Sequence, residues 1–262
     1  MSGGEGGSDR DAGTRSIGKE IAIAAPPDAV WRALTDAEEL RRWFPADARV
    51  EPGVGGTIWV SWGGEMAWEN PITIWEPGRH LRTAMPAEPG AVPFAVDYYI
   101  EARGGATILR LVNSGFGSGA EWDDMYFGMD GGWTYFLYNL RFYLERHAGK
   151  PRALAFERRP MQDRTVFPAL FRALGLDSEA TVAPGTPVSV PLGGSALPGT
   201  VVLSLPSHLA VEIPGLDDAL LFFELEPGPA PHFGMYLSTY GTPPGRAAEL
   251  EREVAGFLDR VA

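Results

Sequence analysis

The sequence predicts an α+β protein in which a series of antiparallel strands is followed by a long helix, and in which this order occurs twice. Apolar residues alternate with polar ones from Asp47 to Val112, as in strands that bury one face. From residue 131 to 146 the apolar residues recur with the helical period instead. After residue 160 a helix, short strands and a final helix follow in the same order.

The first 45 residues supply one strand and two short helices. A strand is expected over 17–24, where apolar residues alternate with polar ones. The prolines at 26 and 27 end this strand. Apolar residues at positions 30, 33 and 34 have helical spacing and predict the first helix. Asp36 occupies the N-cap position of the second helix, with Glu39 three residues later.

Four alternating segments form the expected antiparallel meander. They cover residues 58–62, 72–75, 94–100 and 109–111. Gly-Gly pairs at 55–56, 63–64 and 104–105 and a Pro-Gly pair at 77–78 separate them as turns.

The long helix predicted over 131–146 is apolar on more than one side. One side presents Trp133, Phe136, Leu137, Leu140 and Leu144, and the other presents Tyr135, Tyr138 and Phe142. A helix that is apolar nearly all round is buried on two sides. We therefore expect it to pack on its own sheet and on a second partner, which is either another domain or another chain.

The predicted domain organisation has four parts. Residues 1–15 are rich in Gly, Ser and Asp and are expected to form a flexible tail rather than a signal peptide. The first domain covers 16–150, a charged linker covers 151–162, and a second, smaller α+β domain covers 163–262. Two short echoes suggest that the second domain is a degenerate copy of the first: Pro52-Gly53 recurs as Pro184-Gly185, and His80-Leu81 recurs as His208-Leu209.

Composition narrows the functional classes. The net charge of −12 disfavours partners with a phosphate backbone, so nucleic acid is not expected. The absence of cysteine excludes disulfides, thiolate metal sites and cysteine nucleophiles. No apolar run is long enough to insert into a membrane, and we expect a cytoplasmic protein.

Residues 16–148 resemble the START-like (SRPBCC) superfamily, and more narrowly the branch named for the activator of the heat-shock-protein-90 ATPase. The motifs are specific in combination and weak singly. The resemblance rests on Ala25-Pro26-Pro27 through Asp36, on Leu40-x-x-Trp43-Phe44, on Gly55-Gly56-Thr57, on Gly105-Ala106-Thr107 through Phe116, and on Gly132-Trp133.

The resemblance implies a helix-grip fold, in which an antiparallel sheet wraps round a long C-terminal helix and encloses an apolar cavity. It implies no single activity, because members bind lipids, polyketides or hormones, catalyse cyclisation or hydrolysis, or assist chaperones. Binding of a small hydrophobic or aromatic molecule in this cavity is the leading hypothesis. The predicted ligand-binding residues are Trp62, Phe94, Tyr98, Asn113, Phe116, Trp133 and Phe136.

Each of these rings can equally be an ordinary core residue, since protein interiors are close-packed. Asn113 stands where the family often has histidine, so an acid–base role for this position is in doubt, and its simplest alternative role is in a turn. Two further functions stay open: a cyclase or hydrolase that uses the same cavity, and a chaperone-related regulator that binds a protein partner. Homodimerisation also stays open.

Other chemistry-bearing residues have simpler explanations. Glu65, Glu69 and Asp97 are expected at the surface, with no catalytic residue assigned. The acidic segment 121–126 is expected to be a solvated loop or a helix start rather than a cation site. The four histidines lack the spacing of metal ligands. No metal and no cofactor is predicted.

Overall fold

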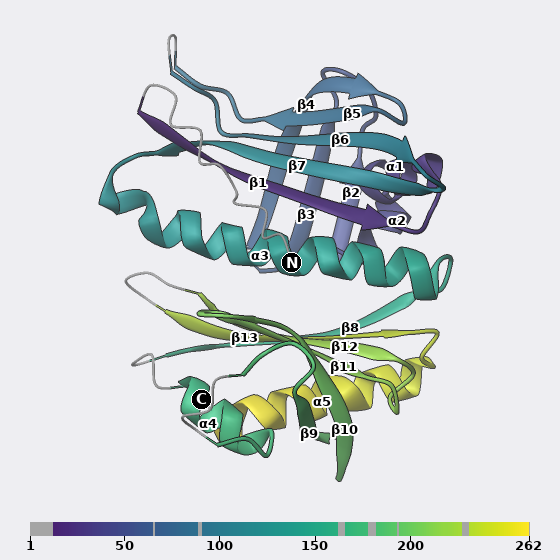
Figure 1. Cartoon of the computed structure of the whole chain (residues 1–262), viewed down its shortest axis with the longest axis vertical. Helices are drawn as coiled ribbons and strands as arrows, with labels where there is room; N and C mark the ends of the chain where they lie inside the picture. Colours follow the sequence, from purple (N-terminus) through teal and green to yellow (C-terminus); the bar gives the residue numbers. More distant parts are fainter. Residues whose placement is uncertain are drawn as a thin grey trace. The chain divides into compact units, whose positions relative to one another are not determined.

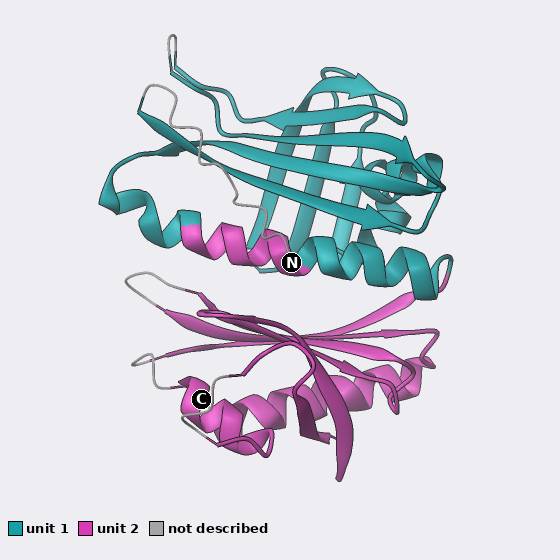
Figure 2. Ribbon diagram, in the orientation of Figure 1, with its two compact units in different colours: residues 1–126, 136–149 teal, residues 127–135, 150–262 magenta. Residues whose placement is uncertain are grey.

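A computed structural model describes residues 13–261 apart from 65, 89–90, 162–165, 178–181, 193 and 227–230. The chain divides into two compact units (Figure 2). The first comprises residues 1–126 and 136–149, and the second comprises residues 127–135 and 150–262. Each unit contains one antiparallel sheet and at least one long helix (Figure 1).

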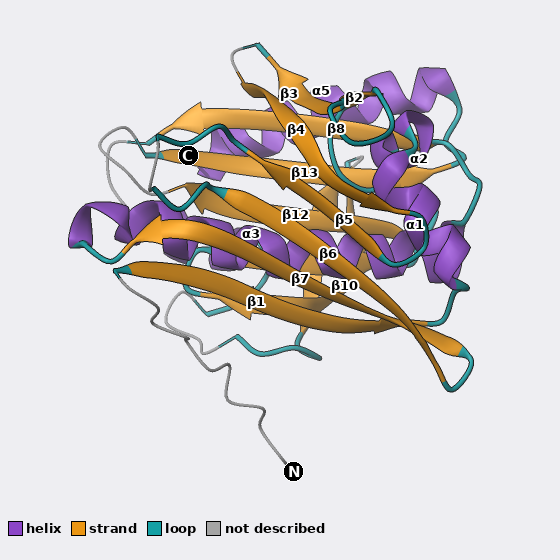
Figure 3. Cartoon of the chain, turned by 90° about the horizontal axis from the view of Figure 1, so that it is seen from above, coloured by secondary structure: helices purple, strands orange, loops and turns teal. Residues whose placement is uncertain are grey.

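The first unit is built on a seven-stranded antiparallel sheet with the order β1-β7-β6-β5-β4-β3-β2. The strands are β1 (Thr14–Ile23), β2 (Asp47–Val50), β3 (Thr57–Gly63), β4 (Met66–Glu76), β5 (His80–Ala84), β6 (Ala95–Arg103) and β7 (Ala106–Gly117). The first and last strands pair with each other, and the strands between them form a meander (Figure 3). The four predicted segments lie in β3, β4, β6 and β7, except that Phe94 directly precedes β6, and β1, β2 and β5 complete the sheet.

Two short helices follow β1. Helix α1 (Pro27–Thr35) starts with a proline, whose missing N–H is no loss in a first turn. Helix α2 (Ala37–Arg41) begins at Asp36, whose side chain accepts a hydrogen bond of 3.0 Å from the backbone N–H of Glu39. The predicted N-cap is therefore confirmed.

The long helix α3 (Asp123–Phe142) follows β7 and the short 3-10 helix η1 (Ala120–Trp122), and it ends in a π-helical turn, η2 (Tyr143–His147). It starts eight residues earlier than predicted. The acidic segment 121–126 is therefore a helix start, and Asp123 in its first turn pairs with Arg15 at 2.6 Å. Residues 127–135 of α3 belong to the second unit.

The second unit contains a six-stranded antiparallel sheet with the order β8-β13-β12-β11-β10-β9. The strands are β8 (Arg152–Pro160), β9 (Pro187–Leu192), β10 (Ser195–Leu205), β11 (His208–Ile213), β12 (Ala219–Glu226) and β13 (His232–Tyr240). Its helices are α4 (Val166–Ala173) and α5 (Pro244–Val261). The apolar stripe of α5, from Leu250 to Val261, is buried in the core with one face of this sheet.

The second unit repeats the topology of the first with one strand fewer. In both sheets the first strand pairs with the last and a long helix follows the last strand; two short helices follow the first strand in the first unit, and one, α4, follows it in the second. β4 and β10 each have 11 residues, and each is followed by a short turn and a histidine, His80 or His208, that opens the next strand. The prediction of a degenerate helix-grip copy is confirmed.

The prediction of a linker over 151–162 is wrong for most of that segment. Strand β8 occupies residues 152–160 and pairs with β13 along its whole length. It is the counterpart of β1. Its charged residues Arg158 and Arg159 have partners far along the chain, Glu226 and Asp259, so a strand can hold them.

Candidate functional site

The face of the first sheet that meets α3 is the candidate site and is named the inner face below. Phe116 of β7 contacts Tyr126 of α3, with ring centroids 5.3 Å apart. Trp62 of β3 contacts Phe136 of the same helix at 5.9 Å. Both sheet residues therefore lie on the side that α3 covers within the first unit.

Strand register decides which other side chains share the inner face, because alternate residues of a strand point to opposite faces. Two adjacent rows of directly paired residues cross β1, β7, β6 and β5: Lys19, Leu111, Tyr98 and Leu81 form one, and Ile17, Asn113, Val96 and Thr83 form the other. The predicted residues Tyr98 and Asn113 therefore lie on neighbouring strands of one face.

Three of these inner-face residues are polar and buried. Tyr98 is 8 % exposed, Thr83 is 7 % exposed and Asn113 is fully buried. Burial raises the pKa of the Tyr98 phenol well above its usual range, so the hydroxyl is neutral and can donate a hydrogen bond. The side-chain N–H of Asn113 donates a hydrogen bond of 3.0 Å to the backbone carbonyl of Ala95. The amide nitrogen of Asn113 therefore has a partner within the sheet.

Lys19 and Thr83 are inner-face residues that the sequence analysis did not single out. Lys19 lies between Ile17 and Ile21 in the alternating pattern of β1. This pattern alone predicts that its side chain lies on the same face as these two apolar residues. A half-buried lysine on an apolar face is uncommon, since burying an ammonium group is costly. Thr83 lies in a strand too short to show its own pattern.

The predicted aromatic residues form two separate clusters. In the first, Trp62 contacts Phe44, Phe136 and Trp68, with ring centroids 5.0, 5.9 and 5.7 Å apart. Phe44 and Phe136 also meet edge to face at 4.7 Å. These rings touch one another, so in this conformation they fill much of the space that they were predicted to line.

The second cluster consists of Phe94, Phe116 and Tyr126. Phe116 is fully buried and meets Phe94 at 5.1 Å and Tyr126 at 5.3 Å, both edge to face. The last predicted residue, Trp133, is buried but lies in the α3 segment that belongs to the second unit. The structure therefore divides the seven predicted residues among two ring clusters, a polar patch and the second unit.

Two irregularities in the strands set the direction of two of these rings. Trp62 is the extra residue in a bulge of β3, between the pairs Ser61–Ala67 and Gly63–Met66. Gly115 is the extra residue opposite β1, with φ of +93°. A β-bulge re-aims the neighbouring side chains, and such bulges are frequent beside binding sites.

The indole N–H of Trp62 is buried and has no hydrogen-bond acceptor among the described residues. The indole N–H of Trp43, on the same side of the domain, donates to the carbonyl of Ala33 at 2.8 Å. An unmade hydrogen bond at a buried donor costs about 1–3 kcal/mol. Within the described part of the chain, Trp62 Nε1 is thus a buried donor without an acceptor.

The acidic residues considered for catalysis lie away from the inner face. Asp97 points to the opposite face of β6, where His80 Nε2 lies 2.7 Å from its carboxylate. Glu69 is exposed and pairs with Trp59, on the outer face of β3. Glu65 lies outside the described residues. In the described part of the chain no group of three or more His, Cys, Asp or Glu residues gathers as a metal site would require.

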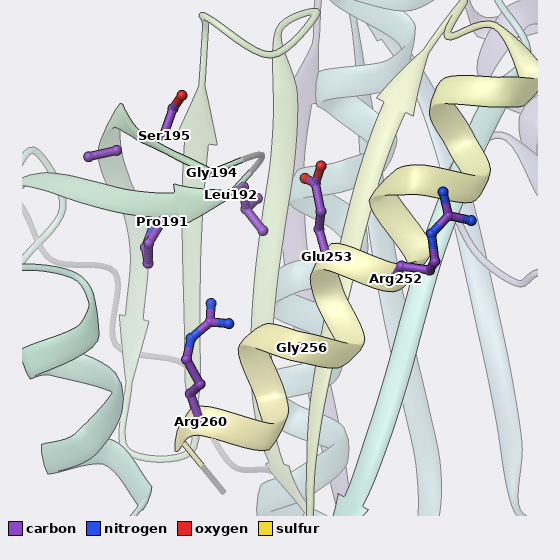
Figure 4. Close-up of a pocket in the computed structure, with 9 residues that line it drawn as sticks. Pro191, Leu192, Gly194, Ser195, Arg252, Glu253, Gly256 and Arg260 are labelled. Atoms are coloured by element: carbon purple, nitrogen blue, oxygen red, sulfur yellow. The ribbon is translucent and has the colours of Figure 1, made fainter.

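Two open hollows lie elsewhere. One, of about 440 Å³, is on the outer face of the first sheet, beside the row Glu20, Arg110, Tyr99, His80 and Glu76. The other, of about 540 Å³, is in the second unit. In that hollow Arg260 and Glu253 extend from α5 on the side where Pro191 and Leu192 lie (Figure 4), and Glu253 is already paired with Arg246 at 2.7 Å.

The seven-stranded sheet with its closing helix defines the first unit as a START-like helix-grip domain. Residues 24–145 match the sequence profile of the family described as activator of Hsp90 ATPase homolog 1-like protein. The match covers less than half of the 262 residues, and of the second unit it includes only residues 127–135. No curated protein matches the chain.

Solved structures show similarity at low identity. The Aha1 dimer from Colwellia psychrerythraea is 23 % identical, covers 51 % of this chain and 98 % of its own, and has a TM-score of 0.45. DynU16, from the dynemicin biosynthetic locus, is 19 % identical over 94 % of this chain and 97 % of its own, with a TM-score of 0.42. The di-domain ARO/CYC protein BexL, from the BE-7585A biosynthetic pathway, is 14 % identical over 94 % and 95 %, with a TM-score of 0.44.

Among the described residues no helix is long and apolar enough to cross a membrane.

Proposed function

We propose that the first unit binds a small, mainly apolar molecule that carries a hydrogen-bonding group, on the inner face of its sheet. The observation that supports this most is the set of buried polar side chains, Tyr98, Asn113 and Thr83, among apolar neighbours on one face. Binding sites for small molecules typically combine apolar walls with a few polar groups that fix orientation.

The two ring clusters supply the apolar part of the proposed site. They are anchored at Trp62 and at Phe116 and lie on the inner face with the polar patch. Because the rings of the first cluster are in contact, we expect binding to turn aromatic side chains rather than fill a rigid cavity. Tryptophan fluorescence should report this change.

A pair of variants on one strand tests the proposal. Tyr98 faces the inner side and its neighbour Tyr99 faces the outer side. Tyr98→Phe removes one hydroxyl and keeps the ring, so the affinity of a hydroxyl-bearing or carbonyl-bearing apolar ligand should fall about 3- to 10-fold. Tyr99→Phe should leave the affinity unchanged.

Ligands for this test come from a thermal-shift screen of apolar alcohols, acids and ketones against the whole chain. Affinities would then be measured by quenching of tryptophan fluorescence. If Tyr99→Phe lowers affinity as much as Tyr98→Phe does, the ligand does not use the inner face. If no apolar compound binds the wild-type chain, the proposal is wrong.

A further inference from the structure

The buried indole N–H of Trp62 lacks a hydrogen-bond acceptor among the described residues, and the packing of the domain does not explain why. Its ring is well packed, with three aromatic neighbours within 5.9 Å, yet its polar atom has no acceptor among the described residues. Buried N–H groups in native proteins are almost always paired, and an exception calls for a cause. Trp43, which is fully buried, does pair its own N–H.

The backbone around Trp62 is arranged to hold this ring in place. Trp62 is the bulge residue of β3, and the Ser61 hydroxyl accepts a hydrogen bond of 2.9 Å from the N–H of Gly63, which fixes the turn that follows. Gly63 has φ of +97°, a conformation that favours glycine. The bulge removes one residue of β3 from the backbone pairing with β4. It also points the indole of Trp62 toward the inner face.

Solvent reaches this cluster through Trp68. Trp68 pairs with Val60 across β3 and β4, so it lies on the same face as Trp62, and its ring contacts Trp62 at 5.7 Å. Trp68 is 51 % exposed, whereas Val60 is buried. A half-exposed indole beside an unpaired buried donor gives an entering molecule an apolar surface first and a hydrogen-bond donor behind it.

We infer that Trp62 Nε1 donates a hydrogen bond to an oxygen of the bound molecule, and that the first unit therefore selects apolar, ring-containing compounds that carry a carbonyl oxygen. This inference rests on the proposed function and makes it more specific. A carbonyl oxygen is an acceptor without a proton of its own, and it suits a donor-only partner such as an indole. A hydrocarbon of the same shape leaves the N–H unpaired.

A matched pair of probes isolates this hydrogen bond. 2-Acetylnaphthalene and 2-ethylnaphthalene have nearly the same size, and only the first has a carbonyl oxygen. We expect the wild-type chain to bind the acetyl compound about tenfold more tightly. Trp62→Phe keeps an aromatic ring and removes the N–H, so the two compounds should bind this variant with equal affinity.

Trp59→Phe is the matched control. Trp59 lies on the opposite face of the same strand, where the guanidinium of Arg49 lies 4.1 Å from the centre of its ring. This variant should keep the tenfold preference. The indole N–H proton of Trp62, observed by NMR in the wild-type chain, should shift downfield with the acetyl compound and not with the ethyl compound. This measurement needs no variant.

The outcomes separate the inference from the proposed function. Equal binding of both probes to the wild-type chain, or a preference that Trp62→Phe retains, overturns the inference and leaves apolar ligand binding intact. A Trp62 N–H signal that does not respond when the acetyl compound is bound also overturns it. Binding of neither probe, together with a negative ligand screen, counts against both.

Discussion

The direction of single side chains decides what the inner face can do. The alternation of apolar residues in β6 was enough to predict that Tyr98 faces inward, because a strand has a fixed period of two. For Asn113 the sequence left a turn open as an alternative, and the structure places it within β7 on the same face. Lys19 obeys the same rule but was overlooked as part of a polar pair. The unpaired N–H of Trp62 could not be predicted, since it depends on the positions of neighbours from β4, α3 and the segment after α2.

Asp97 is a buried carboxylate on the outer face of the first sheet, and His80 is its closest partner. Asp97 is 5 % exposed, His80 Nε2 lies 2.7 Å from it, and Arg82 Nε lies at 3.9 Å. His80→Leu removes the hydrogen-bonding partner and leaves the carboxylate under-solvated. We expect a loss of about 2 kcal/mol in the free energy of unfolding, measured with urea.

His80→Gln tests whether a hydrogen bond is the cause, because a glutamine amide can donate to Asp97. It should restore part of the lost stability. An equal loss in both variants would assign the effect to the stacking of His80 on Tyr99, whose rings lie 4.3 Å apart.

At the scale of elements, most strands and helices could be predicted from their periods, and the bulges could not. A bulge shifts the pairing by one residue, and the sequence of one strand does not reveal how many residues oppose it. β8 was missed for a related reason. Its charges are compatible with a strand because partners 68 and 100 residues away neutralise them, and such distant pairs leave no local pattern.

The bulge at Gly115 provides a prediction at this scale. Gly115 has φ of +93°, and a Cβ there would lie 2.6 Å from the Pro93 carbonyl oxygen and 2.7 Å from Phe94 Cα. Gly115→Ala therefore adds a steric clash to backbone strain and should destabilise the protein by more than about 2 kcal/mol. It should also displace the Phe116 ring, and so weaken ligand binding.

Gly105→Ala is the matched control for this variant. Gly105 has φ of +86°, and nothing lies within 4 Å of the position its Cβ would take. This variant introduces backbone strain without a steric clash. Its loss in the free energy of unfolding should therefore be smaller, about 1 kcal/mol. Equal losses in thermal or urea unfolding would show that the close approach of Pro93 and Phe94 has no energetic effect.

At the scale of the whole molecule, the tandem order of the two units could be predicted from the repeated order of elements and from short echoes such as His80 and His208. The assignment of α3 could be predicted only in part. Its apolar character on several sides indicated a second partner, and residues 127–135 do belong to the second unit. The division point within the helix depends on contacts, such as the stacking of Tyr135 on Phe222 with ring centroids 3.5 Å apart.

Buried tyrosines in both units make alkaline pH a test of the whole fold. Burial raises the pKa of Tyr135 to about 12, and it also raises the pKa values of Tyr98, Tyr143 and Tyr236. For Tyr135 the unfolded chain has a pKa of 10.0. Below pH 10 the phenol is protonated in both the folded and the unfolded chain, so its burial contributes its full stabilisation to the folded state. Above it the unfolded state releases a proton that the folded state retains, so stability falls as the pH rises from 10 to 12.

For Tyr135 alone this shift corresponds to a loss of about 3 kcal/mol across that interval. We expect the urea midpoint to decrease steeply above pH 10, and tyrosinate absorbance from the buried residues to appear only together with unfolding. Tyr135→Phe cannot ionise at this position and keeps the ring that stacks on Phe222, so its stability should decrease less steeply over the same interval. Tyrosinate that forms fully at its usual pH in a chain whose circular dichroism is unchanged would contradict the burial of these four phenols.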